Sequence, residues 1–152
     1  MYLFIASDHF GYPLKASIVD HLKARGVDFE DLGVVSEEKV TNYPDVALEG
    51  CLGIKEGKYQ YGILVCGTGI GMAMAANKIS GIYAASAHDI YSAERAKKSN
   101  DSNVLCLGRH IVGPELANML VDAWLDSEFG GGRSKPKVDR IREIEKRYMK
   151  EA

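Results

Sequence analysis

The residues best suited to chemistry lie in segment 62–77, where a cysteine ends an apolar run and a glycine-rich turn follows it. Residues 62–65 are Gly-Ile-Leu-Val, Cys66 comes next, and glycines occupy positions 67, 69 and 71. This order predicts a buried strand, a tight turn and a helix whose first turn is almost bare backbone. Unpaired N–H groups at such a helix start attract anions, and a thiol beside them becomes reactive. The segment therefore predicts a site for a small anionic substrate.

Three histidines also follow predicted strands. His9, His88 and His110 each come just after an apolar run, whereas His21 falls within a predicted helix. We expect His21 to be a surface or packing residue. Any one of the other three could be structural, but three at one edge of a sheet favour a functional role for at least one of them.

Strand-like and helix-like segments alternate along the whole chain and would position these residues. The strands are predicted at 2–6, 27–31, 62–66, 82–87 and 103–107, and a last amphipathic helix covers 138–148. Strict alternation predicts a parallel sheet with helices on both faces, in one domain spanning residues 1–152. Because ligands bind beyond the carboxyl ends of such strands, the turns with Asp8, Cys66, His88 and His110 are expected at one edge.

Composition argues against several classes of function. The chain has 152 residues, a formal net charge of −2 and three cysteines. No basic excess indicates nucleic acid, no apolar run is long enough for a bilayer, and the start of the chain lacks the basic stretch of a signal peptide. Cys51 and Cys106 form no C-x-x-C pair or disulfide framework with Cys66 and are expected to be structural. We therefore expect a cytoplasmic protein with no nucleic-acid or membrane partner.

The glycine-rich turn differs from other motifs of similar composition. A dinucleotide fingerprint would need a glycine at Met72, and a thiol phosphatase loop would need an arginine there. A receiver domain would need an aspartate in place of Cys66. Histidines and carboxylates show no metal-ligand spacing. The residues therefore predict neither a nucleotide cofactor nor a metal.

Six short motifs follow one another along the chain: Ser7-Asp8-His9, Asn42-Tyr43-Pro44-Asp45, Cys66-Gly67-Thr68-Gly69-Ile70-Gly71, Ala75-Ala76-Asn77-Lys78, Ser99-Asn100-Asp101 and Gly131-Gly132-Arg133. In this order they resemble the ribose-5-phosphate isomerase type B family and its relatives, the galactose-6-phosphate isomerase subunits. The resemblance implies a three-layer α/β/α Rossmann-like fold with a five-stranded parallel sheet and a C-terminal helix. It also implies homodimers, or dimers of dimers, with active sites shared between two subunits and no metal or nucleotide.

The resemblance implies a catalytic role for the turn. Cys66 would be the base that moves a proton between C1 and C2 of an open-chain aldose phosphate, and Thr68 would shuttle hydroxyl protons. Backbone amides of the turn would hold the enediolate that develops in the transition state. The expected contacts here are Gly67, Gly69, Ile70 and Gly71.

The resemblance also implies how the substrate is bound. Asp8 and Tyr43 would position the sugar. His9 and Arg133 would bind the phosphate together with Lys137, which stands where the family has an arginine. The stable phosphate is therefore expected away from the glycine turn itself.

Besides Lys137, other positions depart from the family pattern. A family histidine credited with opening the furanose ring is replaced by Ser99, and His110 replaces a family arginine. Ser99, Asn100 and His110 are expected to contact the substrate. Ser134 follows Arg133 where a histidine is common, and His88 is absent from many members. We hypothesise that His88 supplies the missing acid/base group. Alternatively, a tetrose 4-phosphate cannot close a furanose ring and would make that group dispensable.

The expected function is the interconversion of D-ribose 5-phosphate and D-ribulose 5-phosphate. One alternative is isomerisation of another sugar phosphate, either erythrulose 4-phosphate and erythrose 4-phosphate or a hexose 6-phosphate. A second is a catalytically silent, ligand-binding subunit. The presence of Cys66 and the intact glycine turn favours an active enzyme.

Overall fold

The computed structural model describes residues 1–150, and a parallel sheet forms its centre. Within these residues, five strands are ordered β2-β1-β3-β5-β4, and every neighbouring pair is parallel. The strands are β1 (Tyr2–Ser7), β2 (Asp28–Gly33), β3 (Tyr61–Cys66), β4 (Ala84–Ser86) and β5 (Val104–Gly108). The parallel sheet expected from the sequence is confirmed.

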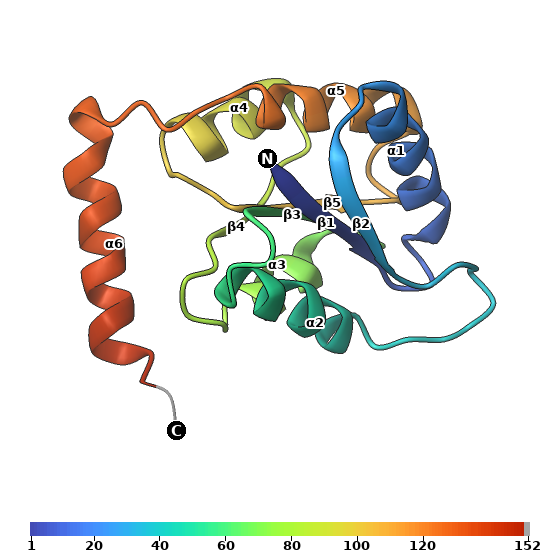
Figure 1. Ribbon diagram of the computed structural model, residues 1–152, viewed down its shortest axis with the longest axis horizontal. Helices are drawn as coiled ribbons and strands as arrows, with labels where there is room; N and C mark the ends of the chain where they lie inside the picture. Colours follow the sequence, from blue (N-terminus) through green and yellow to red (C-terminus); the bar gives the residue numbers. More distant parts are fainter. Residues whose placement is uncertain (151–152) are drawn as a thin grey trace.

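Helices cover both faces of the sheet, which gives three layers (Figure 1). One face carries α1 (Tyr12–Ala24), α4 (Ile90–Lys98) and α5 (Pro114–Leu125), and the other carries α2 (Tyr43–Lys55) and α3 (Ile70–Ala76). This arrangement confirms the α/β/α fold. No helix in the described part of the chain is both long enough and apolar enough to cross a membrane.

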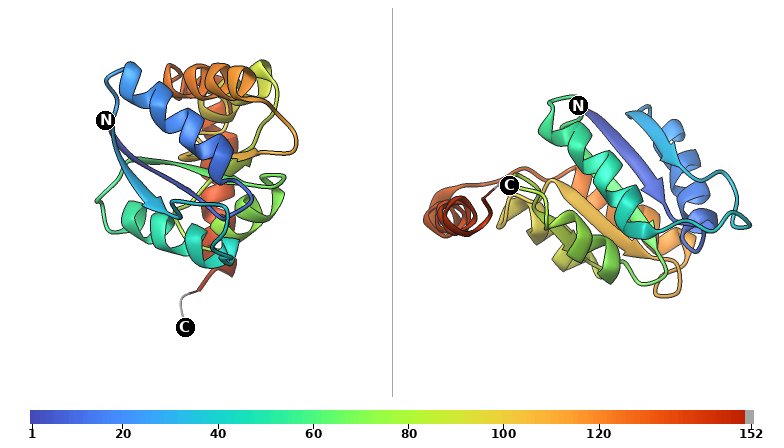
Figure 2. Two further views of the ribbon diagram at one scale, coloured as in Figure 1. Left: turned by 90° about the vertical axis from the view of Figure 1, so that its right-hand side faces the viewer. Right: turned by 90° about the horizontal axis from the view of Figure 1, so that it is seen from below.

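The C-terminal helix stands apart from these layers. A short 3-10 turn, η1 (Gly132–Ser134), leads into α6 (Lys135–Tyr148), which lies beyond the β4 edge of the sheet (Figures 1 and 2). Glu145 accepts hydrogen bonds from the hydroxyl of Tyr83 at 2.6 Å and the N–H of Gly81 at 2.7 Å. Only the first turns of its apolar face are covered, because Val138 is buried while Ile141, Ile144 and Tyr148 are exposed.

Alternation along β3 decides which layer receives each side chain. Ile63 and Val65 pack beneath α1 and α5, whereas Leu64 and Cys66 pack in the cluster beneath α2 and α3. The thiol of Cys66 therefore lies between the sheet and the α2–α3 layer, at the carboxyl end of the strand.

β4 spans only Ala84–Ser86 and is therefore shorter than the expected span 82–87. Before it, Asn103 accepts the N–H of Tyr83 through its side chain at 2.8 Å and donates its own N–H to the carbonyl of Tyr83 at 3.1 Å. At the start of this edge strand, Asn77 donates to the carbonyl of Ala84 at 2.9 Å and accepts its N–H at 2.8 Å. Side chains thus satisfy backbone groups around the start of β4.

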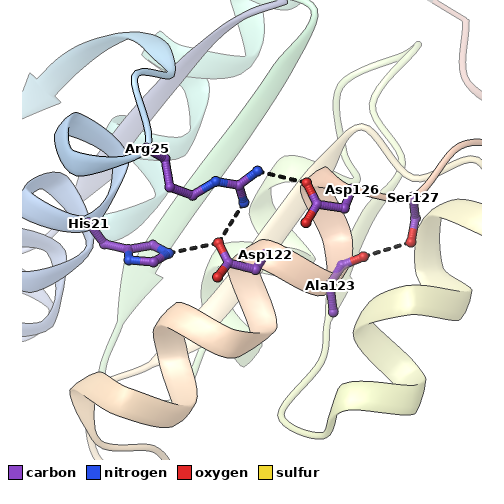
Figure 3. A network of polar contacts seen from close by, with 6 residues as sticks. All are labelled: His21, Arg25, Asp122, Ala123, Asp126 and Ser127. Carbon is purple, nitrogen blue, oxygen red and sulfur yellow. Dashed lines mark hydrogen bonds and ion pairs between the residues drawn. The ribbon is translucent and has the colours of Figure 1, made fainter.

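A polar network joins α1 to α5 (Figure 3). Arg25 donates to Asp122 at 2.5 Å and to Asp126 at 2.7 Å, and His21 Nε2 lies 2.7 Å from Asp122. Burial raises the pKa of Asp122, but the hydrogen bonds from His21 and Arg25 outweigh it and leave that pKa lowered. His21 thus has the surface role expected of it.

Candidate active site

A cavity of about 790 Å³ opens at the carboxyl ends of β1 and β3. Its walls are the turn after β1, the segment that enters α2, and the turn between β3 and α3. The cavity brings together eight of the expected site residues: Asp8, His9, Tyr43, Cys66, Gly67, Thr68, Ile70 and Gly71. The predicted edge of the sheet therefore carries a cavity around the predicted thiol.

The turn at Cys66 directs one backbone N–H toward the sulfur. Gly69 has a left-handed φ of 76°, which glycine adopts without strain, and its N–H donates to Cys66 Sγ at 3.1 Å. The N–H of Ile70 donates to Thr68 Oγ1 at 3.2 Å. Gly71, in the first turn of α3, has no intrahelical acceptor for its N–H and lines the cavity. An anion in the cavity therefore finds both a thiol and a backbone donor.

The other two cysteines share the apolar cluster of Cys66 but do not line the cavity. Burial raises the pKa of Cys51 to about 12 and raises that of Cys106 well above its usual value. Both thiols therefore stay protonated, while Cys66 alone among the three free cysteines meets the cavity. Within residues 1–150, no group of three His, Cys, Asp or Glu side chains is placed to hold a metal ion.

Asp8 and His9 are held in fixed orientations at the end of β1. Asp8 is 3% exposed, and its Oδ1 accepts the N–H of Gly11 at 2.9 Å. His9 accepts the N–H of Thr41 through Nδ1 at 3.2 Å, and its ring packs on Phe10 with centroids 4.3 Å apart. Because Nδ1 accepts a backbone hydrogen, the ring proton must be on Nε2. His9 therefore offers a substrate an Nε2–H donor.

Tyr43 closes the side of the cavity formed by α2. A Cβ at Gly71 would come within 2.6 Å of the Tyr43 ring, so the bare backbone at that position makes room for the phenol. Several lining residues were not predicted: Phe10, Val40, Thr41, Asn42, Pro44, Asp45 and Met74. The motif at 42–45 signalled three of them. The others come from loop and helix positions without a distinctive pattern.

His110 and His88 lie beside the turn without lining the cavity. The N–H of His110 donates to the carbonyl of Gly67 at 2.9 Å, and its ring would meet a Cβ at Gly67 at 3.2 Å. His88 Nε2 accepts the N–H of Gly108 at 2.9 Å. Burial lowers the pKa of His88, although the charge of Asp89 acts in the opposite direction. An acid/base role for His88 stays a prediction.

The remaining expected residues lie away from the cavity. Ser99 accepts a hydrogen bond from Arg95 Nε at 2.7 Å at the end of α4, and Asn100 lines a second cavity of about 310 Å³ beside α6. Arg133 is in η1 and Lys137 in α6, the helix that lies beyond β4 (Figure 1). None of these four residues lines the cavity around Cys66.

The register of β5 explains this separation. Val104 pairs with Gly62 at one end of β5, and Gly108 pairs with Cys66 at the other. Asn100 precedes Val104, so the rise of a parallel strand puts it at least roughly 13 Å from Cys66. Cys66 and Asn100 thus lie toward opposite ends of β5 in a single chain.

Comparison with known proteins places this architecture in a family. The family model described as Ribose/Galactose Isomerase matches residues 3–141. The "Ribose-5-P isomerase B" of Listeria innocua is 50% identical over 147 residues, covering 97% of this chain and 99% of that protein. The "D-erythrulose-4-phosphate isomerase" of Pectobacterium atrosepticum is 49% identical over 137 residues, covering 90% of each.

Solved structures agree with the sequence matches. The structure of ribose-5-phosphate isomerase B from Mycoplasma genitalium, with bound ribulose-5-phosphate, superposes with a TM-score of 0.90. It is 38% identical and covers 95% of this chain and 96% of that chain. The fold, the cavity at the carboxyl edge and these matches lead to one conclusion: the chain belongs to the ribose/galactose isomerase family.

Proposed function

We propose that the chain is an aldose–ketose isomerase of sugar phosphates, with D-ribose 5-phosphate and D-ribulose 5-phosphate as its substrate pair. The observation that carries the proposal is the position of Cys66, buried at the end of β3, within a cavity and beside the N–H of Gly69. The names of the relatives and the pentose phosphate bound by one of them support the choice of substrate.

In the reaction, Cys66 acts as the base in its thiolate form. It removes the proton from C2 of the open-chain aldose, the C–H electron pair forms the C1–C2 double bond, and the C1 oxygen takes up negative charge. Backbone N–H groups of the turn stabilise this enediolate. The thiol then returns the proton to C1 while the C2 oxygen becomes the ketone. No co-reactant is consumed, because the proton taken from C2 is returned to C1.

The other residues of the cavity hold the substrate during this transfer. Thr68 moves a proton between the C1 and C2 oxygens. Asp8 and Tyr43 hold the sugar hydroxyls, and His9 donates its Nε2–H to the phosphate. A neutral histidine contributes one directed hydrogen bond, so most of the positive charge opposite the phosphate comes from elsewhere.

We infer that a second copy of the chain supplies that charge. Arg133 and Lys137 do not line the cavity around Cys66 in one chain. A shared site would have the partner bring them, together with Ser99 and Asn100. Exposed apolar side chains stand where such a partner would pack: Ile70 and Met74 at the cavity, and Ile141, Ile144 and Tyr148 on α6. Burial of these side chains would stabilise a homodimer.

A tetrose phosphate is the second candidate substrate, and two observations favour it. One close relative is a D-erythrulose-4-phosphate isomerase, and Ser99 stands where many relatives have the histidine credited with ring opening. The hexose 6-phosphates and a silent subunit are weaker candidates. We place the enzyme in the cytoplasm, because its three cysteines are free thiols.

The test is a panel of tetrose 4-phosphates, pentose 5-phosphates and hexose 6-phosphates, in which kcat/KM is measured for each. We expect D-ribose 5-phosphate to give the highest value. A higher value for erythrulose 4-phosphate would move the assignment to the tetrose. No turnover of any of the three classes would refute the proposed activity.

A further inference from the structure

β4 ends before its neighbour does, and a side chain completes the hydrogen bonding there. Ser86 is paired with Cys106, so Gly108 lies two positions beyond the last pair of the two strands. At the other end, the N–H of Val104 reaches the carbonyl of Tyr83, which shows that even-numbered residues of β5 donate toward β4. The N–H of Gly108 finds no strand carbonyl in that direction. His88 Nε2 accepts it instead, at 2.9 Å.

Gly108 is in direct backbone contact with the turn that follows Cys66. A Cβ at Gly108 would lie 2.5 Å from the carbonyl carbon of Thr68, so no side chain fits between the two segments. Gly69 also approaches Leu107 closely, since a Cβ at Gly69 would lie 3.0 Å from the carbonyl carbon of Leu107. The end of β5 is therefore the surface on which the turn rests.

Hydrogen bonds fix the turn to the same segment. The N–H of Arg109 donates to the carbonyl of Cys66 at 2.9 Å, and the N–H of His110 donates to the carbonyl of Gly67 at 2.9 Å. With the close approaches at Thr68 and Gly69, every residue from 66 to 69 is held by residues 107–110. A shift of the end of β5 would thus move the thiol and the backbone donors together.

We propose that His88 is a positioning residue, which fixes the end of β5 by accepting the N–H of Gly108 and thereby places the Cys66 turn against the substrate. This role rests on the function proposed above. It differs from the expected acid/base role, because His88 Nε2 accepts a backbone amide and the residue does not line the cavity around Cys66.

The acceptor role requires an unprotonated Nε2, and the surroundings of His88 supply this condition. Burial lowers the pKa of His88, and Asp89 is the charged neighbour that opposes the shift. The carboxylate of Asp89 accepts the N–H of Ser92 at 2.7 Å as the cap of α4, so part of its charge is already compensated.

The kinetic test compares His88→Ala with His88→Gln, whose amide oxygen can still accept a hydrogen bond. We expect His88→Ala to lower kcat roughly 10- to 100-fold with KM nearly unchanged, because misplacing the turn affects chemistry more than binding. His88→Gln should recover most of kcat. It should also lose the fall in kcat at acidic pH that protonation of His88 causes in the wild-type protein.

His21→Ala is the matched control, since His21 lies in the α1–α5 network and touches no part of the turn. It should keep the wild-type kcat. If His88→Gln is folded but as inactive as His88→Ala, the acid/base role holds and positioning is overturned.

A second measurement needs no substrate. Nitrogen-15 spectra of the wild-type histidines should show His88 with its proton on Nδ1 and a free Nε2. Amide hydrogen exchange should be faster in His88→Ala than in wild type at both Gly108 and Gly69. Faster exchange at Gly108 alone, or a proton on Nε2, would overturn the coupling to the turn. If the exchange pattern is as expected but the protein isomerises no sugar phosphate, the proposed function is refuted and the positioning role stands.

Discussion

At the carboxyl edge of the sheet the chain closes a cavity around Cys66, whereas at the amino edge it leaves Asn100 exposed beside the partly uncovered helix α6. At the carboxyl edge, backbone hydrogen bonds hold the thiol of Cys66 and the ring of His9. Helix α6 carries Lys137, follows directly on Arg133 in η1, and stands apart from the layers. If the proposed function is correct, the difference means that one chain holds its catalytic groups in place and its phosphate-binding groups only in part.

The largest effect is expected at Cys66, at the carboxyl edge of the sheet. Cys66→Ala removes the proposed base and should lower kcat roughly 1,000-fold, within the range typical of acid–base groups, without changing the fold. Steady-state kinetics with D-ribose 5-phosphate and a thermal melt would check this. Cys106→Ala is the control, because that thiol is buried in β5 and should affect stability rather than turnover. A fully active Cys66→Ala enzyme would contradict the mechanism.

A substitution at Arg133 should weaken substrate binding rather than slow the chemical step. Arg133→Ala should raise KM about 30-fold, which corresponds to about 2 kcal/mol of lost phosphate interaction, with a smaller change in kcat. Arg140→Ala is the matched control, since Arg140 is an exposed arginine of α6 that pairs with Glu143. Equal effects of the two substitutions would remove the distinction between phosphate binding and general charge.

Lys97 allows a test through the stability of the fold. It lies near the end of α4, just before Ser99 and Asn100. Lys97 is 2% exposed, and its ammonium lies 3.9 Å from the Tyr61 ring centroid and 4.3 Å from that of Trp124. Burial lowers the pKa of Lys97 to about 8, against the nearby charges of Asp126, Asp101 and Glu128.

A folded-state pKa below the unfolded value means that the unfolded chain binds more protons between about pH 8 and pH 10. The free energy of unfolding should therefore rise with pH in that window, by up to roughly 3 kcal/mol from this group. Denaturant titrations at several pH values should show the rise in wild type and a weaker one in Lys97→Met. Parallel pH profiles for the two proteins would disprove the shift.

The smallest effect belongs to the network between α1 and α5 (Figure 3). Arg25→Gln breaks two ion pairs whose carboxylates are more than a third exposed, so the loss of stability should stay below about 1 kcal/mol. Turnover should match that of the wild-type protein. A large loss of activity would show that the region behind the sheet contributes to the site.

The pattern of apolar and polar residues along the chain predicted most of the fold. The alternation of strand-like and helix-like segments, and the glycines between them, are local signals. The ends of β4 were not predictable in this way. Asn77 hydrogen-bonds Ala84 at the start of β4, seven positions away, and His88 accepts the N–H of Gly108 beyond its end, twenty positions away. Periodicity describes only neighbours along the chain. It cannot show that a side chain accepts a backbone hydrogen bond where a strand would otherwise do so.

The candidate site was predictable to a similar degree. The position of Cys66 at the end of a buried strand and before bare backbone identified the turn from its residues alone. The roles of Arg133 and Lys137 came from the family resemblance, and no local pattern could place them relative to Cys66. The lining by Thr41 and Met74 depends on how α2 and α3 pack, which the sequence pattern does not specify.

The most direct test of the shared site mixes two variants that are each impaired at low substrate concentration. Cys66→Ala and Arg133→Ala chains, each assayed alone, should have little activity at low substrate concentration. After joint unfolding and refolding, half of randomly paired dimers contain one site with both native residues, so about a quarter of the wild-type activity should return. Activity that stays at the sum of the two separate variants would contradict a site built from both edges of two chains.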